Sequence, residues 1–132
     1  MTVREAALET IRLAEARNTE DQAIDNELGG EVGYELGSEG ALKARMTPRP
    51  AETELIRYLE SLPEEVLFKL RTLMYVGRGD ADDILGLHAD LIEDILDRDH
   101  AVSSMFEKSP LPRYLERGLM AAEHASIDLD AT

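Results

Sequence analysis

Residues 73–80 of this 132-residue chain read Leu-Met-Tyr-Val-Gly-Arg-Gly-Asp. The pattern predicts the end of a buried helix, a tight glycine turn and the start of the next helix. A glycine directly after an apolar helical run supplies the left-handed residue that closes a helix, so we expect Gly77 to take that role. Asp80 is a preferred N-cap for the next helix. Arg78 lies between Gly77 and Gly79 without a bulky neighbour, so we expect its side chain to be exposed.

Helical patterns extend from this turn in both directions. Residues 51–61 predict one helix. Leu62-Pro63-Glu64-Glu65 opens another that runs to Val76, with proline in its first turn and carboxylates at its positive end. The second of these helices is apolar almost all round, which predicts a central helix packed on several sides. After the turn, residues 80–98 carry apolar side chains at helical spacing, and a short helix is expected near 100–107.

The last helix is predicted over residues 110–124, with Ser109 as its N-cap and Pro110 in its first turn. Apolar residues recur along it at helical spacing and are expected to face the core. They are Leu111, Leu115 and Leu119.

The N-terminal third has a different character. Residues 3–17 predict a helix, but residues 18–50 hold five of the nine glycines and only five of the 33 Leu, Ile, Val and Phe residues. We interpret 18–50 as a long mobile connection. Val32, Tyr34 and Leu36 alternate with other residues as in a short strand, but an isolated strand would be marginally stable.

These patterns together predict an all-α fold. We expect residues 1–132 to form a single-domain bundle of five or six helices around one core. The long Gly-rich connection (18–50) follows the first helix, and residues 51–124 form the compact helical core.

Composition excludes several classes of function. The chain has no cysteine, and therefore neither disulfides nor thiolate metal sites nor cysteine nucleophiles. Its net charge of −14 disfavours binding to nucleic acid or to an anionic membrane surface. It leaves basic proteins or cations as partners, although solubility is the simpler explanation of the charge. With no apolar run of membrane-spanning length and no secretory signal, we expect a cytoplasmic protein.

Two blocks of the sequence resemble the pattern of the bacterial domain-of-unknown-function family 3775. The first is the stretch at 73–80, where Tyr75 stands in place of the usual tryptophan. The second is Ser-Pro-Leu-x-x-Tyr-Leu-Glu-x-Gly-Leu at 109–119, where Ser109 stands in place of threonine and Arg117 occupies a position that is usually acidic. The resemblance implies a bacterial source and a helical domain. It implies no activity, because none is assigned to the family.

The residues around the turn do not form a calcium loop. Such a loop needs oxygen ligands at alternate positions, a glycine sixth and a glutamate twelfth. Counting from Asp80, the sixth residue is Leu85 and the twelfth is Leu91. An aspartate-rich helix N-terminus explains Asp82 and Asp83 better.

The other candidate sites are also incomplete. No two of the three histidines lie three or four residues apart, and Asp97 with His100 supplies only two ligands where a transition metal usually takes three or four. Ser103 and Ser104 lie near His100 in sequence but point in different directions on a helix. We therefore predict no metal, no cofactor and no catalytic residue. The acidic run from Asp90 to Asp99 is most simply a solvated helix face.

The turn itself is the candidate functional or structural loop. Glycines before a helix can bind an anion, but the spacing around Arg78 is not that of a nucleotide loop, and a connector in which Arg78 holds a carboxylate is the simpler reading. We predict that Arg78 faces Tyr114 and Glu116, and that Tyr75 belongs to the same group of residues.

Two classes of function follow from these residues. The leading hypothesis is a small cytoplasmic helical protein-interaction module without catalysis, which acts through a protein partner or as a homodimer. The alternative is an enzyme or small-ligand binder that uses Arg78 with Tyr114 and Glu116. A pocket joining the three side chains would favour the alternative, and a flat apolar patch would favour the module.

Overall fold

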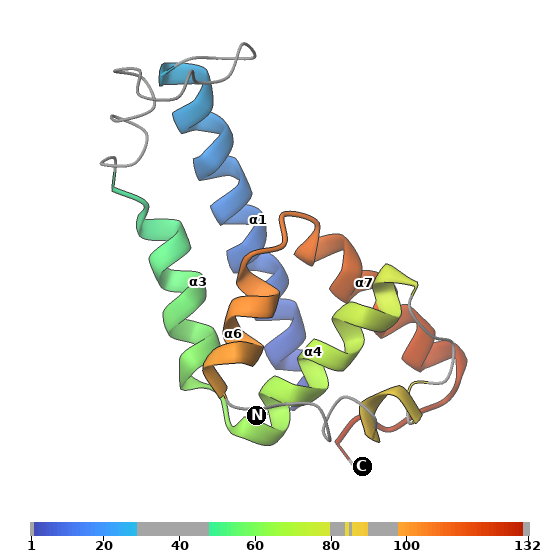
Figure 1. Ribbon diagram of the computed structural model, residues 1–132. Helices are drawn as coiled ribbons and strands as arrows, with labels where there is room; N and C mark the ends of the chain where they lie inside the picture. The colour runs from blue at the N-terminus through green and yellow to red at the C-terminus, as the bar shows by residue number, and fades with distance from the viewer. Residues whose placement is uncertain (1, 29–47, 80–83, 85, 90–97, 131–132) are drawn as a thin grey trace.

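The computed structural model describes residues 2–28, 48–79, 84, 86–89 and 98–130. Every element in these ranges is helical, which confirms the all-α class (Figure 1). Ile84 and residues 86–89 are helical as well. The possible strand at 32–36 and the predicted N-cap Asp80 lie outside the described residues. The labelled helices are α1 (Val3–Leu28), α3 (Pro50–Ser61), α4 (Glu64–Arg78), α6 (Arg98–Phe106) and α7 (Leu111–His124).

Helix α1 is longer than the sequence predicted. It continues past residue 17 to Leu28, so the first part of the predicted connection 18–50 is helical. Ile24 on this extension is buried, and polar contacts to the start of α3 hold it. The Glu20 carboxylate accepts hydrogen bonds from the backbone N–H groups of Ala51 (2.9 Å) and Glu52 (3.3 Å), and Asp21 pairs with Arg49. A carboxylate at a helix N-terminus satisfies free amide groups, here from a neighbouring helix.

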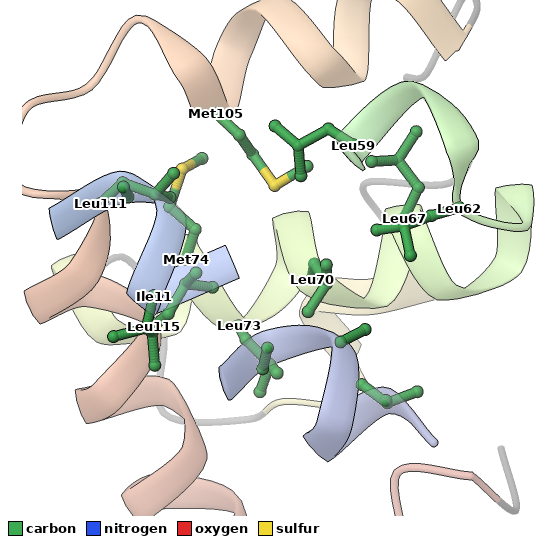
Figure 2. Close-up of a cluster of buried hydrophobic side chains, with 14 of the residues drawn as sticks. Ile11, Leu59, Leu62, Leu67, Leu70, Leu73, Met74, Met105, Leu111 and Leu115 are labelled. Atoms are coloured by element: carbon green, nitrogen blue, oxygen red, sulfur yellow. The ribbon is translucent and has the colours of Figure 1, made fainter. Parts of the chain in front are cut away.

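Helix α4 is central, as predicted from its apolar surface. It packs against α1, α6 and α7 (Figure 1). Figure 2 shows Leu70, Leu73 and Met74 of α4 among side chains from other helices, including Met105 and Leu115. All five side chains are at most 1% exposed. The predicted burial of α7 through its leucines is also confirmed, since Leu111, Leu115 and Leu119 all belong to this core.

The end of α4 differs from the prediction. Gly77 lies inside the helix, and Gly79 is the left-handed C-cap, with φ of 98°. Its N–H donates to the carbonyl of Val76 at 3.0 Å. The assignment of Gly77 as the residue that closes the helix was therefore wrong by two positions. Gly77 serves a different purpose, which the packing of α7 explains.

The start of α7 is displaced by one residue from the prediction. The N-cap position is taken by Pro110, which makes no side-chain cap, and Pro112 lies in the first turn. Ser109 is therefore not the N-cap. It contributes its carbonyl, which accepts a hydrogen bond from Asn18 Nδ2 at 2.8 Å and so ties α7 to α1.

Candidate functional site

The two sequence blocks meet where α4 crosses α7. A Cβ atom on Gly77 would lie 1.7 Å from the carbonyl oxygen of Tyr114, and one on Gly118 would lie 2.2 Å from that of Leu73. Both glycines thus allow one helix backbone to touch the other. Because Leu73 meets Gly118 while Gly77 meets Tyr114, the two helices run antiparallel. The glycines are required by this close approach.

Beside this crossing, three cations gather on one aromatic ring. Arg71 and Arg78 lie one helical turn before and after Tyr75 on α4, and Lys108 comes from the turn between α6 and α7. The guanidinium carbons lie 5.1 and 4.8 Å from the ring centroid, and Lys108 Nζ lies 5.7 Å from it. These distances are those of cation–π contacts. We call Arg71, Tyr75, Arg78 and Lys108 the Tyr75 cluster.

Arg71 is the buried member of the Tyr75 cluster. It is 6% exposed, and its Nε donates to Ser104 Oγ at 3.2 Å. The carbonyl of the same serine accepts a hydrogen bond from Lys108 Nζ at 2.6 Å. Arg71 Nη1 is buried without a hydrogen-bond partner. In the part of the chain that the structure describes, neither Arg71 nor Lys108 pairs with a carboxylate.

The structure divides the predicted site residues among three places. Tyr75 and Arg78 lie together, and Arg78 is exposed as expected. Tyr114 is half-buried at the helix crossing, and Glu116 is exposed on α7. The pairing of Arg78 with Tyr114 and Glu116 stays a prediction, because the guanidinium group of Arg78 lies over the ring of Tyr75.

Two members of the Tyr75 cluster were not among the predicted site residues. Arg71 could have been found, because the spacing of Arg71, Tyr75 and Arg78 places them on one stripe of a helix. Lys108 could not, because it reaches the ring from another part of the chain.

A buried threonine and a histidine lie together on another side of α4. Thr72 Oγ1 lies 2.7 Å from His88 Nδ1 and 3.1 Å from the carbonyl oxygen of Phe68. Either the Thr72 hydroxyl donates to His88 Nδ1, or it donates to Phe68 and His88 donates to Thr72, depending on the histidine tautomer. Burial lowers the pKa of His88 below its ordinary value, and the positive charge of Lys69 lowers it further. The contact between Thr72 and His88 joins α4 to the helical residues 86–89.

Neither a metal-ligand cluster nor a membrane-spanning helix occurs within the described ranges. No three His, Asp or Glu side chains there converge in a way that could hold a metal ion. Among the helices described, none combines the length and the apolar character needed to cross a membrane.

The outer edges of α1 and α7 form one exposed face. An ion pair joins Arg4 to Glu123 at one end (3.3 Å), and the bond from Asn18 to Ser109 joins the helices at the other. These two contacts show that α1 and α7 run antiparallel, so residues later in α1 lie beside residues earlier in α7. We call the exposed residues along this register the α1–α7 face. They are Arg4, Leu8, Arg12 and Glu15 on α1, and Glu123, Met120, Glu116 and Arg113 on α7.

The large hydrophobic side chains that are exposed in the described chain both belong to this face. Leu8 is 51% exposed and Met120 is 57% exposed. Leu8 follows Arg4 by one helical turn, and Met120 precedes Glu123 by one helical turn. The two side chains therefore lie at the same level along the antiparallel helices. Exposed apolar groups with a charged rim are a feature of association surfaces.

Comparisons with protein-family models, with curated proteins and with solved structures found no match. The resemblance to family 3775 therefore stays a prediction, and the geometry of the chain alone carries the functional argument.

Proposed function

We propose that the protein is a small cytoplasmic interaction module without catalysis, and that it associates with a second copy of itself through the α1–α7 face. The observation that carries this proposal is the pair of exposed side chains Leu8 and Met120 at one level of two antiparallel helices. Covering them removes apolar surface from water, which is the main driving force of protein association.

The charges on the α1–α7 face support a second copy as the occupant. At each level of the register, the side chain on α1 and the side chain on α7 are either both apolar or opposite in charge. The levels are Arg4 with Glu123, Leu8 with Met120, Arg12 with Glu116, and Glu15 with Arg113. Arg12 also forms an ion pair with Glu9 on its own helix, and Glu9 is not part of the face. The charges of the eight residues of the face therefore balance, although the whole chain carries a charge of −14.

This arrangement complements itself under twofold symmetry. A symmetric dimer buries the same patch on both copies. If the twofold axis runs along the seam between the helices, α1 of one copy faces α7 of the other at the same level. Every charge then faces an opposite charge, and each Leu8 faces a Met120. All neighbouring helices in the resulting four-helix arrangement are antiparallel, as in up-down bundles.

Sedimentation equilibrium tests the dimer directly. We expect the wild-type chain to dimerise at roughly micromolar to submillimolar concentration, and Met120→Asp to be monomeric because it buries an unpaired charge at the centre of the face. Arg57→Asp is the matched control, since Arg57 is exposed on α3, outside the face. A wild-type chain that stays monomeric throughout this range would contradict the proposal.

Charge reversal tests the register. The double variant Arg4→Glu, Arg12→Glu and the double variant Glu116→Arg, Glu123→Arg should each repel their own copies. Mixed together, the two variants should form a heterodimer, because the acidic α1 of one faces the basic α7 of the other. Loss of the dimer in both variants without recovery on mixing would show that the copies do not meet in this register.

The second candidate function is small-ligand binding at Arg78. The specific observation in its favour is the Tyr75 cluster, in which Arg78 joins a buried arginine that no carboxylate of the described chain neutralises. The residues better placed to act with Arg78 are Arg71 and Lys108, because they lie over the same Tyr75 ring as Arg78 does. Among the described residues, Tyr114 and Glu116 have no such contact.

A further inference from the structure

We infer that the Tyr75 cluster is a binding site for the phosphate group of a small molecule. The Tyr75 cluster lies on a different surface from the proposed dimer face. The observations behind the proposal are the unsatisfied buried group of Arg71 and the ammonium group of Lys108 beside the same ring.

The Tyr75 cluster gathers positive charge. In a chain with 28 acidic and 14 basic side chains, three cations converge on one ring. Like charges held this close repel one another, and the attraction of a ring face for each cation only partly offsets that repulsion. Net charge repels an anion at long range, but salt screens that repulsion beyond about 8 Å at physiological ionic strength. Arg71 and Lys108, which pair with no carboxylate of the described chain, therefore provide local positive charge for an anion at the cluster.

Arg71 carries a buried hydrogen-bond donor that is not satisfied. A buried donor without a partner destabilises the folded chain, and the cost is larger when the group is charged. Ser104 satisfies the Nε atom of Arg71, but Nη1 has no partner. An anionic oxygen that reached Nη1 would supply the missing acceptor.

Access to Arg71 depends on its flexible neighbours. Nη1 is closed off from solvent in this arrangement. Lys108, which shares the ring with Arg71, is half-buried at the surface, and Arg78 is exposed. The Lys108 side chain is long, and by moving off the ring it can contact an anion on one side while Arg71 contacts it on the other.

The number and direction of the donors favour phosphate over carboxylate. The cluster offers two guanidinium groups and one ammonium group from two parts of the fold. A guanidinium group binds two oxygens of one anion in a fork, and an ammonium group acts as a point charge. A phosphate monoester carries close to two negative charges at neutral pH and has three free oxygens, so it can contact all three cations. A carboxylate has one charge and two oxygens.

Isothermal titration calorimetry at constant ionic strength tests the inference. Inorganic phosphate and glycerol 3-phosphate should each bind saturably to one site per chain, with a Kd of roughly 1 mM or below. Acetate should bind at least about tenfold more weakly. Preference for glycerol 3-phosphate would identify an ester as the ligand, and equal binding would identify the free ion. Absence of saturable binding by both phosphates would overturn the inference.

Variants locate the site. Arg71→Met keeps the length and packing of the buried side chain and should weaken phosphate binding by about tenfold to a hundredfold, the effect of losing a hydrogen bond to a charged group. Lys108→Gln, at a half-buried position, provides a second test that leaves the core intact. Arg57→Gln is the control, because it removes the same charge from α3. Equal weakening by the control and the two cluster variants would place the anion elsewhere.

Sedimentation and phosphate affinity distinguish the phosphate site from the proposed dimer face. Arg71→Met and Lys108→Gln should leave the sedimentation behaviour unchanged, whereas Met120→Asp should leave phosphate affinity unchanged. A shift of the Arg71 Nε–H resonance in NMR spectra on addition of phosphate would show the contact itself. An unmoved Arg71 resonance at saturation would refute the assignment of Arg71 to the site.

Discussion

Helix α7 packs against two neighbours in opposite ways. Against α4 the contact is made by backbone, because Gly77 and Gly118 remove the side chains that would keep the helices apart. Against α1 the outer edge of the contact is polar and exposed, with the Arg4–Glu123 ion pair in solvent. The first contact is closed and determines how the helices pack. The second leaves apolar and charged groups at the surface, where they are available to another chain.

The largest predicted effect is at the glycine contact. Gly118→Ala and Gly77→Ala each place a methyl group against a backbone carbonyl that cannot rotate away. Forcing extra atoms into a well-packed core typically costs 1–3 kcal/mol, and we expect about 3 kcal/mol or more here because backbone must move. Urea unfolding followed by circular dichroism measures the loss.

Gly79→Ala is the control that adds a methyl group without a steric clash. A Cβ atom on Gly79 would meet nothing within 4 Å, but φ is +98° there. We expect a cost of about 1–2 kcal/mol from the left-handed backbone, and a smaller cost for Gly79→Asn. If Gly77→Ala cost no more than Gly79→Ala, the helices would be able to separate, and the contrast between the two faces of α7 would be lost.

The glycine contact also shows what the sequence could and could not predict. Helices 51–61, 64–76 and 110–124 were found because leucines recur in them at helical spacing. The role of Gly77 was misassigned because local pattern reports backbone conformation but not the distance to another helix. Residues 18–28 were missed as helix because Glu20 and Asp21 hold them through polar contacts to α3, which hydrophobic periodicity does not detect.

A smaller effect is expected from His88, which contacts Thr72 of α4. Burial lowers its pKa in the folded protein below the ordinary value of 6.5. Below that pH the unfolded chain binds more protons than the folded chain, so the free energy of unfolding falls as pH falls through 6.5 toward the folded pKa. At higher pH the imidazole is neutral in both states and contributes no pH dependence.

Denaturation between about pH 5 and pH 8 checks this prediction. We expect the wild-type protein to lose stability relative to His88→Gln as the solution is acidified, because the variant has no proton to take up. His124→Gln is the control, since His124 is exposed. A stability difference between wild type and His88→Gln that stays constant across this range would show that His88 titrates alike in both states.

The smallest effect is expected at the outer edge of the α1–α7 contact. The side chains of Arg4 and Glu123 are 56% and 65% exposed, so solvent and salt screen their attraction. A double-mutant cycle with Arg4→Ala and Glu123→Ala, measured under dilute conditions where the chain is monomeric, should give a coupling below about 0.5 kcal/mol. A coupling above about 1 kcal/mol would mean that this edge stabilises the monomer itself. The ion pair would then belong to the fold, as the two glycines do, and its charges would no longer be available for a second copy.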